Sequence, residues 1–434
     1  MSPTFAGVVG LVVLFVLFFF RMPIGVSLLL VGGVGFAALT NWPAASALLG
    51  SEPFHVTSAY ALSVIPLFVL MGHFATLSGM ARDFYAAAYA WIGPWRGGLA
   101  GATIVACSGF SALSGSSVAT AATIGQVALP EMRRYRYDPR LATGAVAAGG
   151  TLGILIPPST GMVVYAILTE QSIGQLFVAG ILPGVLLTVM FMITISAVCL
   201  LCPSYGPPGK VQPIAQRAAA LLRALPMLGI VLVTIGGIYL GFFTPTEAAA
   251  VGAFLAMLLA VVRRALTFGA LLKVLLESVR TSGLVFLILI GATLFSQFIS
   301  VTRIPGDLAQ FLIGLNLPKE AILTLILSTY IVLGTFLEGF AMLVLTLPVV
   351  FPIITTLGYD PIWFGVVMVL VLEMGLISPP LGVNVFVVKG VAGDVPMSQI
   401  FVGILPFWAA MIVTLVILVL VPDIALLLPK SMFR

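Results

Sequence analysis

Two short polar stretches interrupt apolar segments of the sequence, one over residues 108–117 and one over residues 334–339. Both combine small hydroxyl side chains with glycine, and the second adds a carboxylate. If each stretch is the turn of a helical hairpin, the arriving helix presents free carbonyl groups that suit a small cation, and the departing helix presents free N–H groups that suit an anion. The candidate ligand residues in the two turns are Ser114, Gly115, Ser116, Ser117, Gly334, Thr335 and Glu338.

Two further apolar segments are broken by glycine and proline, from Gly153 to Pro158 and from Gly375 to Pro380. Proline lacks an N–H group and clashes with the preceding turn, so each break frees backbone carbonyl groups. Neighbouring side chains add hard oxygen ligands suited to sodium, although a hydroxyl in a membrane helix often bonds to its own backbone instead. The side chains concerned are Thr151, Ser159, Thr160, Ser378 and Asn384.

Three ionisable residues within apolar segments are candidates for a functional role. Glu338 and Glu373 are close to the turns and breaks, and each could serve either site chemistry or structural pairing. His73 could relay protons, but we favour the alternative of a packed, hydrogen-bonded histidine. No Lys or Arg is expected at mid-membrane depth, so a bound anion would be neutralised by cations, helix N-termini and hydroxyl groups.

The elements that must position these residues are membrane helices. Of the 434 residues, 61% are hydrophobic and 8% are charged, whereas about a quarter of a soluble domain is charged. Uncharged runs such as residues 4–20, 172–203 and 400–421 reach the roughly 20 residues that span hydrocarbon. Nothing alternates at period two, as the strands of a membrane barrel would. We therefore predict an all-α polytopic membrane protein.

Composition also argues against other functions. Cys107, Cys199 and Cys202 lie in or beside apolar segments and, with two histidines in the chain, do not make a zinc set. The positive residues are scattered, which argues against nucleic-acid binding. The chain has no Gly-x-x-x-x-Gly-Lys-Ser/Thr loop for ATP and no evident nucleophile and base for an enzyme, so its energy should come from an ion gradient.

Charges predict the orientation of the helices. Continuous spans are expected near residues 4–20, 24–40, 59–78, 175–202, 225–240, 245–262, 282–300 and 398–421. Interrupted segments are expected near residues 97–130, 140–170, 320–356 and 362–392. If the first and third interrupted segments are re-entrant hairpins and the others are broken helices that cross, 15 of the 19 Lys and Arg residues lie on one face, as the positive-inside rule requires. That cytoplasmic set is Arg21, Arg82, Arg96, Arg133, Arg134, Arg136, Arg140, Lys210, Arg217, Arg223, Arg263, Arg264, Lys273, Arg280 and Lys389. Arg303, Lys319, Lys430 and Arg434 lie outside, and both termini are predicted to be outside the cytoplasm.

An internal repeat of about 222 residues relates the two halves of the chain. Tyr137-Asp-Pro returns as Tyr359-Asp-Pro, the first Gly-to-Pro-Pro break returns as the second, and Gly180-Ile-Leu-Pro returns as Gly403-Ile-Leu-Pro. Opposite flanking charges predict that the two copies enter the membrane from opposite faces. Inverted repeats with discontinuous helices are typical of secondary transporters, whose binding site lies where the breaks meet.

The sequence resembles the large membrane subunit of tripartite ATP-independent periplasmic (TRAP) transporters, within the broader ion-transporter superfamily. The likeness runs nearly end to end. It rests on four motifs that begin at Gly109, Gly149, Phe243 and Glu373 and end at Thr120, Ser159, Ala250 and Asn384.

The resemblance implies sodium-driven uptake of small organic anions, such as C4-dicarboxylates or sialic acid, across the bacterial inner membrane. A periplasmic binding protein would deliver the substrate, and a small four-helix membrane subunit is expected as a separate partner in the lipid bilayer. The implied sodium ligands are Ser114, Ser116, Gly150, Gly153, Gly334, Thr335, Glu338, Gly375 and Ser378. The implied substrate contacts are Ser114, Gly115, Ser116, Ser117, Pro158, Ser159, Thr160, Thr335, Pro380 and Asn384.

The resemblance also implies an elevator-type transport domain that moves against a scaffold. We predict N-terminal scaffold spans over residues 1–65, a first repeat with hairpin 1 over residues 66–184, central scaffold spans over residues 185–281, and a second repeat with hairpin 2 over residues 282–407. Residues 408–434 complete the last span and the tail. The alternative from the same superfamily is a single-chain dicarboxylate or citrate symporter, and a channel is a more distant one.

Overall fold

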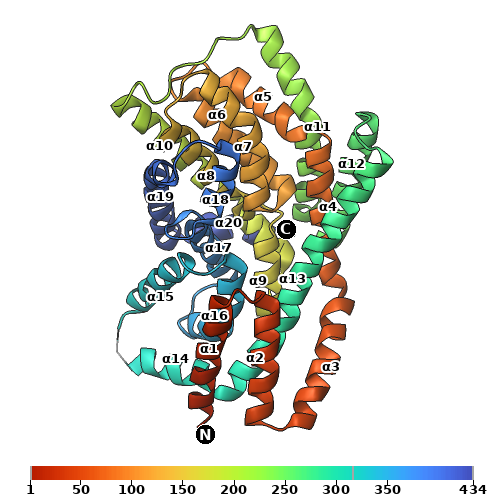
Figure 1. The fold of residues 1–434 in the computed structure, drawn as a ribbon, viewed down its shortest axis with the longest axis vertical. Coiled ribbons are helices and arrows are strands. Elements are labelled where there is room, and N and C mark those ends of the chain that lie inside the picture. Colours follow the sequence, from red (N-terminus) through yellow and green to blue (C-terminus); the bar gives the residue numbers. More distant parts are fainter. Residues whose placement is uncertain (1, 315–316, 433–434) are drawn as a thin grey trace.

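The computed structural model of the chain is built from helices and their connections (Figure 1). It describes residues 2–314 and 317–432, and within them it contains no strand. Eight helical segments are long and apolar enough to cross a membrane, and five shorter apolar helices accompany them. The prediction of an all-α polytopic membrane protein is therefore confirmed. Arg434 lies outside the described residues.

The two predicted hairpins and the two predicted broken helices are all present as interrupted helix pairs. Hairpin 1 consists of α6 (Gly98–Ser114) and α7 (Ser117–Arg134), and hairpin 2 consists of α15 (Lys319–Gly334) and α16 (Gly339–Thr356). The first broken helix consists of α8 (Pro139–Leu155) and α9 (Thr160–Thr169), and the second consists of α17 (Pro361–Ile377) and α18 (Val383–Ala392). We call residues 156–159 break 1 and residues 378–382 break 2.

The other elements surround these pairs. They are α1 (Pro3–Phe19), α2 (Ile24–Leu39), α3 (Trp42–Ser58), η1 (Tyr60–Ser63), α4 (Val64–Leu77), α5 (Met80–Ile92), α10 (Ile173–Leu201), α11 (Ile214–Tyr239), α12 (Pro245–Val262), α13 (Phe268–Thr302), α14 (Ile304–Gly314), α19 (Met397–Leu420) and α20 (Asp423–Ser431).

Local sequence sets many of the helix starts. Asp138 and Asp360 cap α8 and α17 by accepting hydrogen bonds from backbone N–H groups, each directly before a proline at the first helical position. Thr244 and Glu247 form a capping box at the start of α12. These residues therefore have the structural roles that their spacing indicates.

Two predicted helix starts were wrong, and α3 was missed. Helix α11 begins at residue 214 rather than near 225, and α13 begins at residue 268 rather than near 282. Arg217, Arg223, Lys273 and Arg280 end the apolar runs in the sequence, but a charged side chain does not end a helix that continues beyond the hydrocarbon. Helix α3 was not predicted, because Glu52, His55 and Pro53 interrupt its hydrophobicity.

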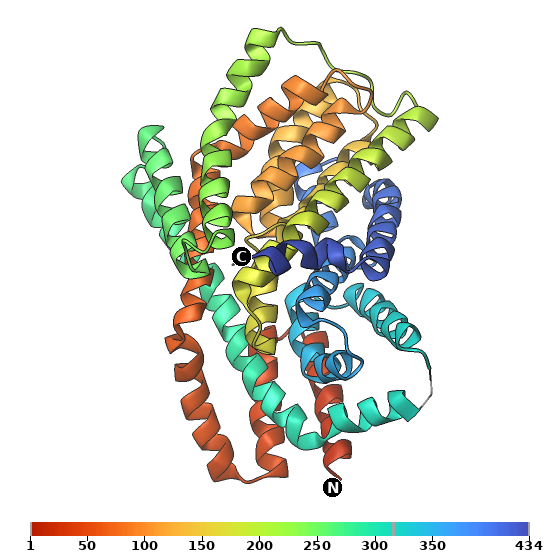
Figure 2. The same cartoon turned by 180° about the vertical axis from the view of Figure 1, so that it is seen from behind.

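The buried centre of the molecule lies where the two halves of the chain meet. Helix α8 packs against α6, α7, α17 and α19, and every residue of α17 from Ile362 to Ile377 is buried. Hairpin 1 lies in the upper half of Figure 1 and hairpin 2 in the lower half. On the other side of the molecule, the long helix α13 runs beside α2 (Figure 2). The buried centre is thus formed by helices of both repeats.

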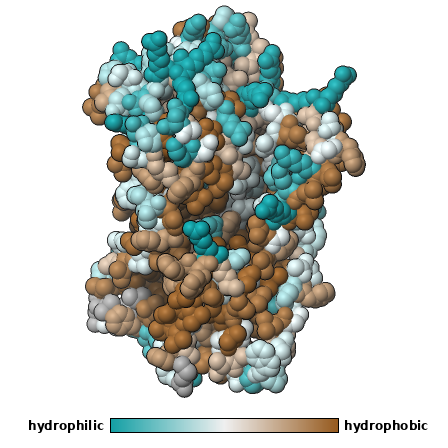
Figure 3. Space-filling view, in the orientation of Figure 1, coloured by the Kyte–Doolittle hydropathy of each residue, from teal (hydrophilic) through white to brown (hydrophobic). Residues whose placement is uncertain are grey.

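Large apolar side chains cover the outer surface. Phe19, Leu201 and Leu232 are exposed, and Val185, Val189 and Ile193 are exposed along α10. In the space-filling view, hydrophilic side chains gather at the upper end and a broad hydrophobic face covers the lower half (Figure 3). Exposed apolar surface of this extent is what a lipid-facing protein requires.

Candidate functional site

The tip of hairpin 1 is a two-residue turn that ends one helix and starts the next. Gly115 adopts the left-handed conformation with φ of 57°, and a Cβ at this position would lie 2.8 Å from the carbonyl oxygen of Pro158. Glycine is needed here both for its positive φ and for the close approach. The Oγ of Ser116 then caps α7 by accepting a hydrogen bond from the N–H of Ala119 at 3.3 Å.

Hairpin 1 lies directly against break 1. Thr160 Oγ1 donates a hydrogen bond to the carbonyl oxygen of Gly115 at 3.0 Å. Ser159 caps α9 by accepting from the N–H of Met162 at 3.2 Å, and Pro157 and Pro158 are buried. The N-termini of α7 and α9 therefore lie beside one another, as the predicted site requires. Both serines already accept one helix N–H, so their remaining capacity is the hydroxyl donor and a second lone pair.

The hydroxyl groups of Ser114 and Ser117, on either side of the tip, are hydrogen-bonded within the protein. Ser114 Oγ lies 2.6 Å from Thr120 Oγ1 in the following helix. Ser117 Oγ donates to Glu373 Oε1 of α17 at 2.6 Å, across 256 residues of sequence. Hairpin 1 is thus bonded to both broken helices.

Hairpin 2 repeats this design with a longer turn. Helix α15 ends at Gly334, and the Glu338 carboxylate caps α16 by accepting from the N–H of Ala341 at 3.2 Å. Thr335 Oγ1 donates to the carbonyl oxygen of Val332 in its own helix at 2.7 Å. Thr335 therefore has the backbone-bonded arrangement that was the alternative to a ligand role. Thr151 also bonds to its own helix, at the carbonyl oxygen of Ala148.

Hairpin 2 meets the helix that precedes break 2 through two glycines. A Cβ on Gly375 would lie 2.7 Å from the carbonyl oxygen of Gly334, so the two backbones touch here. Ser378 Oγ donates to the carbonyl oxygen of Met374 at 2.7 Å and accepts from the indole N–H of Trp408 at 3.0 Å. Both predicted backbone ligands, Gly334 and Gly375, are thus adjacent.

The two breaks differ in exposure. Pro157 and Pro158 are buried, whereas Pro379 and Pro380 are exposed. Break 2 borders a cavity of about 470 Å³. The residues that line it include Thr335, Ser378, Pro379, Phe401 and Trp408. The site is therefore closed around hairpin 1 and open beside hairpin 2.

The remaining predicted ligands lie behind hairpin 1. A Cβ on Gly153 would lie 2.6 Å from the backbone of Ser116 and Ser117, so α8 packs tightly under the tip. A Cβ on Gly150 would lie 3.2 Å from Asn384 Nδ2. Asn384 is fully buried near the start of α18. These residues come together with hairpin 1, but in the closed interior rather than in the open cavity.

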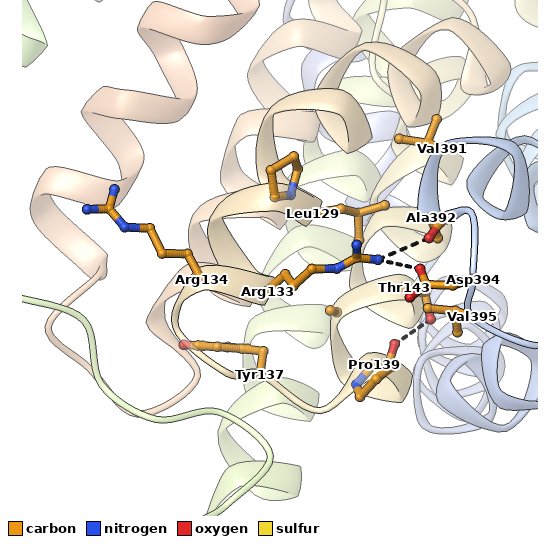
Figure 4. A pocket seen from close by; sticks show the side chains of 12 residues that line it. Leu129, Arg133, Arg134, Tyr137, Pro139, Thr143, Val391, Ala392, Asp394 and Val395 are labelled. Carbon is orange, nitrogen blue, oxygen red and sulfur yellow. Dashed lines mark hydrogen bonds and ion pairs between the residues drawn. The ribbon is translucent and has the colours of Figure 1, made fainter.

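A second cavity of about 470 Å³ lies at the far ends of α7 and α18 (Figure 4). Arg133 points across it and donates to Asp394 Oδ1 at 2.6 Å and to the carbonyl oxygen of Ala392 at 3.1 Å, while Arg134, which also lines the cavity, points away from Asp394. Asp394 lies between α18 and α19, outside the membrane-spanning helices. A hydrogen bond from its own backbone amide, with the hydrogen bond and charge of Arg133, lowers the pKa of Asp394 below its ordinary value.

Sequence reasoning missed the partners of several predicted residues. Thr120 and Trp408 were not singled out, although Thr120 ends the first family motif and Trp408 follows the second Gly-Ile-Leu-Pro landmark by two residues. For His73, the structure places its imidazole 3.7 Å from the Glu277 carboxylate on α13. Residue spacing alone gives no signal for contacts between helices so far apart in sequence.

Paired helical hairpins and broken helices within a polytopic bundle define this protein as a membrane transport protein of the secondary-transporter class. Two solved structures share the fold. The YdaH transporter of Alcanivorax borkumensis matches with a TM-score of 0.63 at 15% identity, covering 88% of this chain and 90% of that one. MtrF of Neisseria gonorrhoeae matches with a TM-score of 0.55 at 13% identity, covering 86% and 82%.

The chain belongs to the family described as tripartite ATP-independent periplasmic transporter, DctM component, whose model matches residues 11–424. It is 39% identical to the C4-dicarboxylate TRAP transporter large permease protein DctM of Pseudomonas aeruginosa, over 88% of this chain and 89% of that protein. It is 34% identical to the sialic acid TRAP transporter large permease protein SiaM of Vibrio cholerae, over 95% and 96%. It is 35% identical to the isethionate TRAP transporter permease protein DctMQ of Oleidesulfovibrio alaskensis, over 95% of this chain and 65% of that longer protein. The predicted family is confirmed.

Proposed function

We propose that this large permease subunit couples the inward flow of sodium to the uptake of a small organic anion across the bacterial inner membrane. A periplasmic binding protein delivers the anion, and a small four-helix membrane subunit completes the transporter. Relatives named for C4-dicarboxylates, sialic acid and isethionate support an acidic substrate. A C4-dicarboxylate is the first candidate, because the relative from Pseudomonas aeruginosa carries that name.

The single observation that supports this proposal is the meeting of each hairpin with the broken helix of its own repeat. Thr160 bonds to Gly115 in the first repeat, and Gly334 touches Gly375 in the second. Each meeting point combines the carbonyl end of one helix with the N–H ends of others, which suits a cation and an anion together. Bound sodium would supply the positive charge that Lys and Arg do not supply there.

Uptake into proteoliposomes tests the proposal. The chain is reconstituted with a small membrane subunit and a binding protein from the same organism, and uptake of a radiolabelled C4-dicarboxylate is measured. We expect uptake under an inward sodium gradient and none under an equal potassium gradient. Equal uptake under both gradients contradicts sodium coupling, and full uptake without the binding protein favours a single-chain symporter instead.

The proposal also includes an elevator movement of the transport domain. The two repeats would move together against scaffold spans such as α1, α2 and α12, along the predicted division at residues 66–184 and 282–407. Cross-linking of cysteines placed on α11 and α12, which pack against one another, should leave uptake intact, because both helices lie in the predicted scaffold. Cross-linking of α5 to α11 should abolish uptake, because it joins a moving repeat to the scaffold.

A further inference from the structure

Glu373 is a buried carboxylate without a cationic partner. It lies in the middle of α17, and none of its surface is exposed. Its Oε1 accepts the hydrogen bond from Ser117, but Oε2 has no hydrogen-bond partner among the described residues. No Lys or Arg in the part of the chain that the structure describes forms an ion pair with it. A lone buried carboxylate costs several kcal/mol, so the site calls for a positive partner.

Asn384 is a second buried polar side chain without a hydrogen-bond partner among the described residues. None of its surface is exposed, and neither Nδ2 nor Oδ1 has a hydrogen-bond partner within the described ranges. Native proteins satisfy nearly all buried polar atoms, so two unsatisfied atoms on one side chain indicate that a ligand belongs beside it. The Oδ1 atom is an acceptor that can coordinate a hard cation.

Gly150 brings α8 close to both Asn384 and hairpin 1. A Cβ on Gly150 would lie 3.2 Å from Asn384 Nδ2, 3.1 Å from the carbonyl oxygen of Ser117 and 2.7 Å from Cβ of Ala121, so these groups pack against the same glycine. The same Ser117 carries the hydroxyl that bonds Glu373. Residues from α7, α8, α17 and α18 thus lie together in one buried polar region, formed by Ser117, Gly150, Glu373 and Asn384, which we call the compartment; it belongs to both repeats.

We propose that Glu373, Asn384 and Ser117 hold a small monovalent cation of the sodium type between the two repeats, apart from the hairpin turns. The compartment supplies a free carboxylate oxygen, an amide oxygen and a backbone carbonyl oxygen, all of which are hard ligands. One carboxylate balances one positive charge, so a monovalent ion leaves the compartment neutral. The proposal deepens the proposed sodium coupling, and it can be tested without transport.

Binding of ²²Na⁺ to the full chain in nanodiscs tests the proposal. Glu373→Gln keeps the shape of the side chain and the acceptor for Ser117 but removes the charge. We expect it to bind one sodium ion fewer per chain than the unmodified protein, or to bind that ion at least about tenfold more weakly. Thr234→Val is the matched control, because Thr234 is buried and bonds only to its own helix. It should leave sodium binding unchanged.

A double variant distinguishes loss of the bound ion from misfolding of the protein. In the double variant Glu373→Gln, Asn384→Asp, the carboxylate is moved from α17 to α18 within the compartment. We expect this variant to bind the lost sodium ion again. Full sodium binding by Glu373→Gln alone overturns the proposal. A folded double variant that binds no more sodium than Glu373→Gln overturns the position of the site.

The same measurement separates this inference from sodium-coupled uptake. If Glu373→Gln binds one sodium ion fewer while uptake by the unmodified protein is independent of sodium, the cation site is supported and sodium-coupled uptake is contradicted. If uptake requires sodium but Glu373→Gln binds as many sodium ions as the unmodified protein, sodium-coupled uptake is supported and the cation site is contradicted.

Discussion

Thr160 Oγ1 donates a hydrogen bond to the carbonyl oxygen of Gly115 at 3.0 Å, joining break 1 to the tip of hairpin 1 across 45 residues. This bond fixes the start of α9 beside the start of α7, so that both helix N-termini face the same region. It also occupies a carbonyl group that a cation could otherwise use. This hydroxyl group thus helps to set the relative position of the two N-termini, together with the packing of Gly115 against Pro158.

Replacement of Thr160 by valine should weaken substrate and sodium binding. The isosteric methyl group cannot donate, and a lost neutral hydrogen bond costs about 1 kcal/mol, which corresponds to roughly fivefold in affinity. Half-saturating sodium for uptake should rise by about this factor. Thr160→Ser keeps the hydroxyl and should behave like the unmodified protein. Normal sodium dependence of the valine variant would show that the bond does not organise the site.

The contact between hairpin 2 and α17 should tolerate no side chain at Gly375. In Gly375→Ala the new Cβ would lie 2.7 Å from the carbonyl oxygen of Gly334, and overpacking of this kind costs about 1–3 kcal/mol. We expect a lower melting temperature and loss of uptake. The matched control is Gly339→Ala in hairpin 2, where the nearest atom, Leu372 Cβ, lies 4.0 Å from the added carbon. Equal behaviour of the two variants would contradict a role for close backbone approach.

Much of this site was predictable from the sequence, because its turns are marked by glycine, proline and serine. The hairpin turns at Ser114 and Gly334 and both Pro-Pro breaks lie where those residues interrupt apolar segments. The internal repeat then showed that the two interrupted pairs correspond. Helix ends outside the hydrocarbon could not be predicted in the same way, because charged residues such as Arg217 and Lys273 continue α11 and α13 into water.

Side-chain partners were the part that the sequence could not supply. The bond from Ser117 to Glu373 depends on how hairpin 1 rotates against α17, and helical periodicity does not fix that rotation. Ser378 has its own carbonyl acceptor and the indole of Trp408, which lies on a different helix. A hydroxyl that looked like a free ligand is therefore already hydrogen-bonded in this state.

Ser116 offers a test of ligand function that can be separated from helix capping. Ser116→Ala should weaken sodium activation of uptake, and loss of the cap alone costs about 1 kcal/mol of helix stability. Ser172, which belongs to neither hairpin, caps α10 with a bond of the same length, 3.3 Å to the N–H of Gln175. If Ser172→Ala lowers thermal stability similarly but leaves sodium activation unchanged, Ser116 acts on the ion. Unchanged sodium activation in Ser116→Ala would remove it from the site.

The ion pair between Arg133 and Asp394 joins hairpin 1 to the loop after α18, and it should persist in mild acid. Because the folded state lowers the pKa of Asp394, the carboxylate stays charged until the pH falls below the ordinary aspartate range. Its contribution to stability is present above the unfolded pKa and is lost as the pH falls through the folded one. We expect Asp394→Asn to melt slightly below the unmodified protein from neutral pH down to about pH 5, with the difference vanishing in stronger acid. Replacement of Arg134, whose side chain points away from Asp394 and does not bond to it, by glutamine should not change this difference. A difference that grows as the pH falls would contradict the assignment, because protonation of Asp394 can only remove the pair.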